Sequence, residues 1–124
     1  MRILIVDDND DARGLVHDNL QRAGYDVLTA ANGVDAIKLA HELEPDLVIL
    51  DLDLPDIDGH AVARLIQRRA GAKPVKIIAL SGHSQPIDLE RSRREGLLLH
   101  LCKPISSAAL LENIASLWAP PLAV

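Results

Sequence analysis

Short, mostly apolar runs recur along the chain, and polar residues follow each of them. The runs at 3–6, 27–30, 47–50, 76–80 and 98–101 have the length and composition of strands buried in a sheet. Between them, apolar residues recur every three or four positions, which indicates helices with one buried face. The pattern therefore predicts five strands that alternate with five helices.

Residues that cap or interrupt helices set the limits of the predicted helices. These limits are Asn9 or Asp10 to Gly24, Asn32 to Pro45, a start after Gly59, the segment 86–95, and a start after Ser106 or Ser107. The inward-facing residues that we expect are Ala12, Leu15, Val16, Leu20 and Ala23, then Ala36, Ile37, Ala40 and Leu43, then Val62, Leu65 and Ile66, then Ile87 and Leu89, and finally Leu110, Leu111, Ile114, Leu117 and Trp118. The segment 86–95 has the fewest apolar anchors, and weakly anchored elements are the ones that move.

Alternation of strands and helices predicts a parallel sheet with helices on both faces. For five such units the common strand order is 2-1-3-4-5, the order of flavodoxin-like folds. In this order the first and third strands are neighbours, and ligands bind beyond the carboxyl ends of the strands near the first strand. We therefore expect an α/β fold of the flavodoxin-like (βα)5 type.

Composition narrows the class of protein. The 124 residues fit one domain, so we expect a single domain, 1–124, without an output domain in this sequence. The net charge of -5 argues against direct binding to nucleic acid, and no apolar run is long enough to span a membrane. The single cysteine, Cys102, excludes an internal disulfide and a four-cysteine zinc site, and we expect it to be buried. These features are typical of a cytoplasmic protein in a reducing compartment.

Chemically active side chains follow four of the predicted strands. Asp7 and Asp8 follow the first, Asp51 the third, Ser81 the fourth and Lys103 the fifth. Two like charges about 4 Å apart repel by about 4 kcal/mol at an effective dielectric constant near 20, so the three carboxylates need compensation. Lys103 supplies one positive charge, and Mg²⁺, which bridges carboxylates to phosphoryl oxygens, supplies two more. This set predicts phosphoryl transfer to Asp51.

Several short motifs occur in a fixed order on the predicted elements. They are Asp7-Asp8, Asp51-x-x-x-Pro55-x-x-x-Gly59, Ser81-Gly82 and Lys103-Pro104. Each motif alone is common, but the full set in this order is specific. With it, the chain resembles the response-regulator receiver domain of two-component signalling over its whole length.

The resemblance implies that Asp51 is the phosphoacceptor. It would attack a phosphohistidine on a histidine kinase or a histidine phosphotransferase. The resemblance also implies a Mg²⁺ ion bound by Asp8, by Asp7 directly or through water, by Asp51 itself and by the backbone carbonyl of Asp53. In such a module the chain catalyses only its own phosphorylation and dephosphorylation.

The resemblance assigns the remaining site residues to the response. Lys103 would pair with the phosphoryl group, Ser81 would donate its hydroxyl to it, and the bond between Lys103 and Pro104 would be cis. The helix 86–95, the strand 98–101 and the last helix would form the signalling face. An unknown downstream protein, or a weak homodimer, would use that face.

Three positions distinguish this chain from the common pattern. The residue three before the family lysine is His100 rather than Tyr or Phe, which is similar to receivers of hybrid histidine kinases. We hypothesise that protonation of His100 biases the response, because histidine titrates near neutrality. Asp53, which we expect to face the mouth of the site, and His83 are candidates for tuning the lifetime of the aspartyl phosphate.

Two other functions are compatible with parts of the sequence. Asp51-x-Asp53 also resembles the Asp-x-Asp of haloacid-dehalogenase-type phosphatases, in which the first acid attacks a phosphate ester. The short chain, the position of this motif on the third strand and the absence of a cap domain oppose that interpretation. A non-phosphorylated interaction module of the same fold is opposed by the complete set of acids, hydroxyl and lysine.

Overall fold

The observed elements alternate along the chain as the apolar pattern predicts. The computed structural model describes residues 1–68, 75–82 and 85–118. Within them the strands are β1 (Arg2–Val6), β2 (Asp26–Ala30), β3 (Leu47–Asp51), β4 (Lys76–Ser81) and β5 (Leu99–Cys102). The helices are α1 (Asp10–Arg22), α2 (Gly33–Leu43), α3 (Gly59–Arg68), α4 (Pro86–Arg94) and α5 (Ser107–Trp118).

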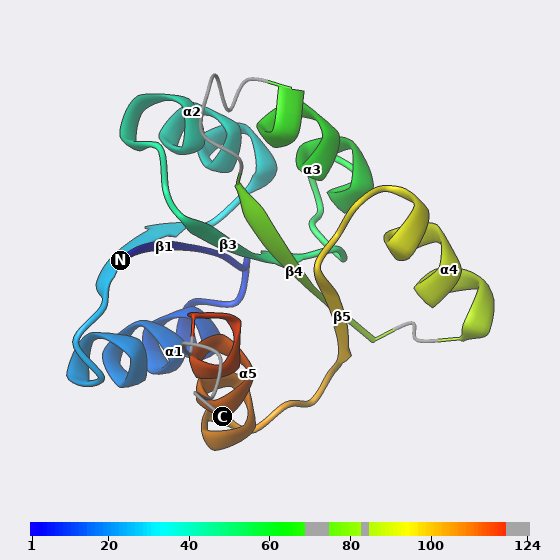
Figure 1. Cartoon of the computed structure of the whole chain (residues 1–124). Coiled ribbons are helices and arrows are strands. Elements are labelled where there is room, and N and C mark those ends of the chain that lie inside the picture. The colour runs from blue at the N-terminus through cyan, green and yellow to red at the C-terminus, as the bar shows by residue number, and fades with distance from the viewer. Residues whose placement is uncertain (69–74, 83–84, 119–124) are drawn as a thin grey trace.

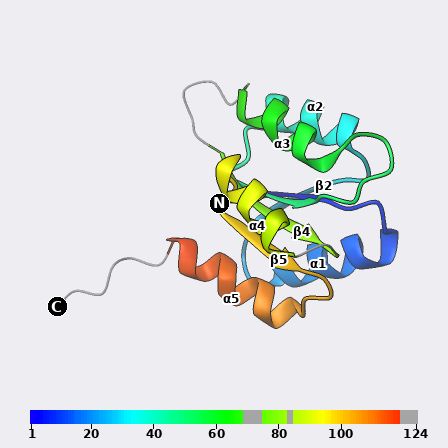
Figure 2. The same ribbon diagram turned by 90° about the vertical axis from the view of Figure 1, so that its right-hand side faces the viewer.

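The strands form one parallel sheet in the order β2-β1-β3-β4-β5, so the predicted topology is confirmed. In Figures 1 and 2, α2 and α3 cover one face of the sheet and α1 and α5 cover the other. Helix α4 lies against β5, at the edge of the sheet. None of the described helices is long and apolar enough to cross a membrane.

The pleat of the strands divides the interior into two apolar cores, because successive side chains point to opposite faces. In β3, Val48 and Leu50 belong to the core under α2 and α3, whereas Leu47 and Ile49 belong to the core over α1 and α5. All of these strand residues are fully buried. Continuing the alternation, Asp51 belongs to the face that carries α1 and α5.

The structure corrects several predictions of burial. In α1, Leu20 is buried, but Leu15 is 60% exposed. The buried face of this helix is therefore narrower than the apolar pattern predicts. Ala23 and Leu65 are also exposed. Cys102, expected to be buried, is exposed near the end of the edge strand β5. The side chain of Trp118 lies outside the described residues.

Helix α4 is not anchored by the apolar residues that we predicted. Ile87 is 75% exposed and Leu89 is 41% exposed. The buried residue of this helix is Ser92, which is 1% exposed. A polar contact between Ser92 and His100 of β5 therefore takes the place of the expected apolar anchors.

The loop between β3 and α3 is fixed at three points. At its start, the amide of Leu52 donates to the carbonyl of Leu80. In its middle, the carboxylate of Asp56 accepts hydrogen bonds from the first two amides of α2, at 3.0 and 3.2 Å, and these bonds lower the pKa of Asp56. At its end, Gly59 packs so closely on Leu52 that a Cβ there would lie 2.4 Å from the Cα of Leu52. This explains why the motif ends in glycine.

We expect Gly59→Ala to destabilise the protein, because the clash is with backbone atoms that cannot move aside cheaply. The expected loss is about 1–3 kcal/mol, the usual cost of overpacking. Gly14→Ala is the matched control: a Cβ at Gly14 meets open space in the middle of α1 and should stabilise by roughly 0.5–1 kcal/mol. Urea unfolding of both variants measures the difference. A Gly59→Ala protein as stable as wild type would contradict the packing argument.

Candidate functional site

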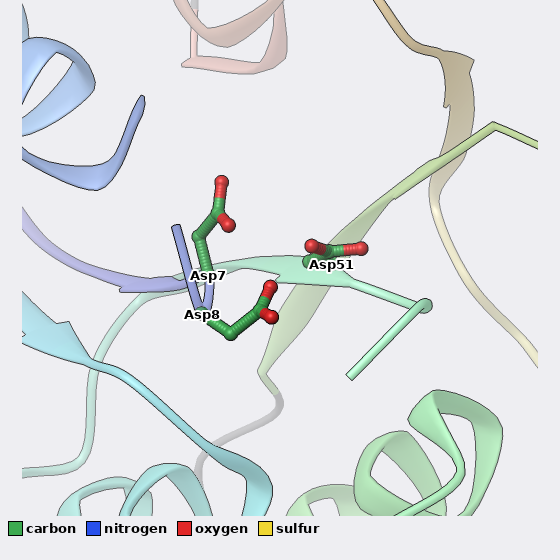
Figure 3. A group of neighbouring side chains, drawn as sticks. All are labelled: Asp7, Asp8 and Asp51. Carbon is green, nitrogen blue, oxygen red and sulfur yellow. The ribbon is translucent and has the colours of Figure 1, made fainter. Parts of the chain in front are cut away.

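Three aspartates gather where β1 and β3 end. The two strands are neighbours, with Val6 paired to Leu50, so the residues that follow them lie at the same edge of the sheet. One carboxylate oxygen from each of Asp7, Asp8 and Asp51 lies within 4.8 Å of the others. Figure 3 shows the three side chains gathered at the ends of the two strands. Asp51 is 1% exposed, whereas Asp7 is half-buried and Asp8 is exposed.

Lys103 compensates the buried charge of Asp51. Its Nζ lies 2.8 Å from Oδ1 of Asp51, and its backbone amide donates to the carbonyl of Ser81 at the end of β4. Burial acts to lower the pKa of Lys103, but the hydrogen bond and the charge of Asp51, helped by Asp7 and Asp53, outweigh it and raise the pKa. The lysine is therefore held as a cation. The peptide bond between Lys103 and Pro104 is cis.

The pKa of Asp7 is raised above its usual value of 3.8. Burial is the largest cause, and the nearby charges of Asp51 and Asp8 act in the same direction. A hydrogen bond from the amide of Asn9, at 2.9 Å, and the charge of Lys103 oppose the shift without cancelling it. The negative charge of Asp7 is thus unfavourable where it stands, and a nearby cation would relieve it.

The donor set fits a magnesium ion. Mg²⁺ binds oxygen ligands at about 2.0–2.1 Å, which sets two ligands of one ion about 3–4 Å apart. The carboxylate oxygens of Asp7, Asp8 and Asp51 need only small side-chain movements to meet that condition. The exposure of Asp8 leaves room for the water ligands that Mg²⁺ retains.

Asp53 lies across the site rather than free in solvent. Its amide donates to Oδ1 of Asp51 at 2.8 Å. Its carboxylate oxygen Oδ2 accepts a hydrogen bond from the amide of Gly82 at 3.1 Å and lies 3.9 Å from Nζ of Lys103. This residue therefore touches the ends of three strands, a role that its sequence position alone did not reveal.

Ser81 and His100 lie on the side of the sheet that faces α4. Ser81 is buried at the end of β4, and His100 is half-buried in β5. The Nδ1 of His100 is 2.6 Å from the hydroxyl of Ser92, which joins β5 to α4. His83 lies outside the described residues.

Two pockets open from this edge of the sheet. The larger, of about 610 Å³, contains Asp7, Asp8, Asp51 and Lys103, and its apolar wall comes from Ala12, Val16, Leu80, Pro104 and Ile105. The smaller, of about 170 Å³, is lined by Asp53, Ser81 and His100 and by Arg91 of α4. The apolar wall was not predicted as part of the site, although the helical spacing of Ala12 and Val16 places them on one face of α1.

A partly buried polar pair beside the smaller pocket was also not predicted from the sequence. His60, 7% exposed at the start of α3, has its Nδ1 2.5 Å from Oε2 of Glu95 at the end of α4. Arg64 and Arg91 each approach the other carboxylate oxygen of Glu95 at 3.3 Å. This cluster ties α3 to α4 through charge. The sequence carries no local signal of it, because the partners are far apart in the chain.

The arrangement can present a carboxylate nucleophile to an electrophile that is rich in negative charge. Asp51 is shielded from water and oriented by two donors to one oxygen. A lysine cation and the carboxylates of Asp7 and Asp8 line the same pocket. These groups are suited to phosphoryl transfer, in which positioning and charge compensation do most of the work.

Comparisons with known proteins agree with this geometry. Residues 3–115 match the model of the response regulator receiver domain. The chain is 32% identical over 114 residues to the polar-differentiation response regulator DivK of Brucella anthropi, and the match covers 92% of this chain and 93% of that protein.

Solved structures give the same result. The chemotaxis protein CheY4 of Vibrio cholerae superposes with a TM-score of 0.86 at 29% identity, over 93% of this chain and 96% of that one. A CheY-like receiver domain from Methanospirillum hungatei gives a TM-score of 0.84 at 28% identity, over 93% and 90% of the two chains. Receiver domains are signalling modules that interact with histidine kinases or phosphotransferases and generally bind Mg²⁺ at an acidic pocket. Together with the fold and the residues at the edge of the sheet, these matches establish the family. The chain belongs to the response regulator receiver domain family.

Proposed function

We propose that Asp51 accepts a phosphoryl group from the phosphohistidine of a histidine kinase or a histidine phosphotransferase, in a step that requires Mg²⁺. The observation that carries this proposal is the nearly complete burial of Asp51 with Lys103 at 2.8 Å and two further acids beside it. A structural aspartate in a turn would need neither the lysine nor the acids.

In the proposed step, a carboxylate oxygen of Asp51 attacks the phosphorus atom. The P–O bond forms as the P–N bond of the phosphohistidine breaks, and the imidazole nitrogen takes the electron pair. Lys103 balances the charge of the transferred group, and Ser81 donates its hydroxyl to one of the phosphoryl oxygens. When bound, Mg²⁺ supplies charge compensation for the phosphoryl oxygens and holds them beside Asp51.

The proposed ligands of Mg²⁺ are the carboxylates of Asp7, Asp8 and Asp51 and the backbone carbonyl of Asp53. The three carboxylates are supported by their mutual proximity and by the raised pKa of Asp7. The carbonyl of Asp53 rests on the resemblance to the family. Asp8 is the most exposed of the three carboxylates, which suits a direct ligand that faces incoming ions.

We further propose that phosphorylation changes the face formed by α4, β5 and α5. Ser81 and His100 border the same small cavity, and His100 is joined to Ser92 of α4. A movement of the Ser81 hydroxyl toward a phosphoryl group would enlarge or reshape this cavity. Because α4 is fixed by polar contacts rather than by apolar burial, its position is sensitive to such a change.

The proposed signalling face carries exposed apolar residues. Ile87 and Leu89 of α4 and Leu98 before β5 are 75%, 41% and 42% exposed. A downstream protein, or a second copy in a weak homodimer, would cover them. We place these partners in the cytoplasm, because the exposed free thiol of Cys102 suits a reducing compartment.

The phosphatase alternative is disfavoured by the family match and by the position of Asp53. In that mechanism Asp53 would serve as acid and base, but its carboxylate is engaged by the amide of Gly82. Sustained turnover of a generic phosphate ester with Mg²⁺ would indicate a phosphatase, whereas stoichiometric self-phosphorylation indicates a receiver.

Incubation with acetyl phosphate and Mg²⁺ should add the mass of one phosphoryl group to the intact protein. Asp51→Asn should abolish the gain, because an amide is not a nucleophile for phosphorus. Intact-protein mass spectrometry gives the result directly. Phosphorylation that survives Asp51→Asn would overturn the proposed function.

We expect Asp7→Asn to raise the melting temperature by a few degrees at pH 7 without metal. A raised pKa in the folded state means that the folded protein holds the proton more tightly than the unfolded chain, so the charge of Asp7 costs stability above that pKa. The gain should shrink as the pH falls toward 3.8, where both states become protonated.

Added Mg²⁺ should reverse the order at pH 7 by stabilising wild type more than Asp7→Asn. Asp11→Asn, in the exposed first turn of α1, is the charge-matched control and should lower stability slightly, since acids favour helix N-termini. Thermal scans in EDTA and in Mg²⁺ test all three proteins. Equal stability of Asp7→Asn and wild type in EDTA would contradict the electrostatic argument.

Ser92→Ala should loosen α4 selectively, because it removes the buried hydroxyl that joins this helix to His100. Loss of a buried hydrogen bond costs about 1–3 kcal/mol, so amide exchange in α4 should accelerate by about fivefold or more. Exchange in α1 is the internal control and should stay unchanged. If α4 exchanges no faster in the variant, the polar contact is not what holds it.

A further inference from the structure

The carboxylate of Asp53 lies between a hydrogen-bond donor and a cation. The amide of Gly82, at the end of β4, donates to its Oδ2 at 3.1 Å. The ammonium of Lys103, at the end of β5, lies 3.9 Å from the same oxygen. This one anionic oxygen thus accepts a hydrogen bond from the residue after β4 and forms a longer ion pair with the residue after β5.

A backbone amide donor with a cation nearby defines a binding position for an oxyanion. The position is adjacent to the nucleophile, because the same ammonium is 2.8 Å from Oδ1 of Asp51. A phosphoryl group attached to Asp51 brings anionic oxygens that need donors. The amide of Gly82 and the ammonium of Lys103 are suitable donors. Asp53 already accepts a hydrogen bond from the amide and forms a longer ion pair with the ammonium.

We propose that Asp53 is an internal anion that holds the phosphoryl-binding donors in the resting state and must withdraw when Asp51 is phosphorylated. This inference rests on the proposed function of Asp51. Withdrawal is feasible, because the side chain of Asp53 is 38% exposed and attached to a surface loop, whereas Asp51 is fully enclosed. Asp53 is therefore a positioning residue that competes with the phosphoryl group.

The competition has a thermodynamic consequence. A ligand that must displace a group already in its site binds more weakly, because the free energy of the displaced contact is subtracted from the free energy of binding. Asp53 stabilises the resting arrangement of Gly82 and weakens binding of any phosphoryl-like anion. The side chain of Asp53 therefore sets the affinity of the site for a phosphoryl-like anion. This effect is independent of the metal, because a substitution of the side chain leaves the backbone carbonyl, the proposed metal ligand, in place.

The first test uses the metal-free protein and does not depend on phosphorylation. In Asp53→Ala, the amide proton of Gly82 should shift upfield and exchange faster in NMR spectra, because its acceptor is gone. Asp58→Asn is the matched control: it removes the same charge from the same loop, but its side chain faces Arg91 at 3.5 Å rather than Gly82. An unchanged Gly82 amide in Asp53→Ala would overturn the proposal.

The second test measures affinity for beryllium fluoride in the presence of Mg²⁺, with beryllium fluoride as the phosphoryl analogue. Asp53→Ala should bind it about fivefold more tightly than wild type, the factor that one net hydrogen bond corresponds to. Asp53→Asn, which keeps an acceptor but loses the charge, should fall between them, and Asp58→Asn should match wild type.

The outcomes separate this inference from the proposed function. If Asp53→Ala binds beryllium fluoride no more tightly than wild type while Asp51→Asn fails to bind, the competition is refuted and the phosphoacceptor role stands. If wild type and Asp51→Asn respond identically, the proposed function is refuted, and the Gly82 amide still reports whether Asp53 holds it. Melting temperatures of all variants verify that each one is folded.

Discussion

The buried charge of Asp51 is the constraint on which the site depends. A carboxylate enclosed by protein loses its hydration, which costs several kcal/mol unless a cation and donors inside the protein replace the water. Here the replacement comes from Lys103, at 2.8 Å, and from the amide of Asp53. Lys103 belongs to the end of β5, two strands away from β3, so Asp51 and Lys103 meet only when β4 is correctly placed between them. The ion pair and the order of the sheet are therefore mutually dependent.

Two pockets lie beside the ends of the strands, and different residues line each of them. Asp51 belongs to the side of α1 and α5, where the larger pocket is open and has an apolar wall. Ser81 and His100 border the cavity on the side of α4. The two pockets thus lie at the same strand ends, where Asp51 lines the larger one and Ser81 and Asp53 line the smaller one.

Much of the fold follows from local patterns in the sequence. Apolar runs such as 47–50 mark strands buried on both faces, and Asn9 and Asn32 cap α1 and α2 as expected, each accepting from an amide three residues later. The parallel order then brings Asp7, Asp8 and Asp51 together without further information.

Other features could not be predicted, because they depend on contacts between distant residues. The exposure of Leu15 and Cys102 is set by how much of α1 and β5 their neighbours cover. The pairs His60–Glu95 and Ser92–His100 replace the apolar anchors that we expected for α4, and polar pairs leave no periodic signal. The contact between Asp53 and Gly82 likewise depends on the loop geometry that follows each strand.

The loop between β3 and α3 has an implication for how the length of this chain can vary. It is fixed at Leu52 by a bond to β4, at Asp56 by the amides of α2, and at Gly59 by contact with its own beginning. Because both ends and the middle of this loop are held by contacts, an inserted or deleted residue would break one of these contacts. Asp51 or α2 would then be displaced. Natural or engineered changes of length should therefore be tolerated in other connections. The length of this loop fixes the distance between Asp51 and α3.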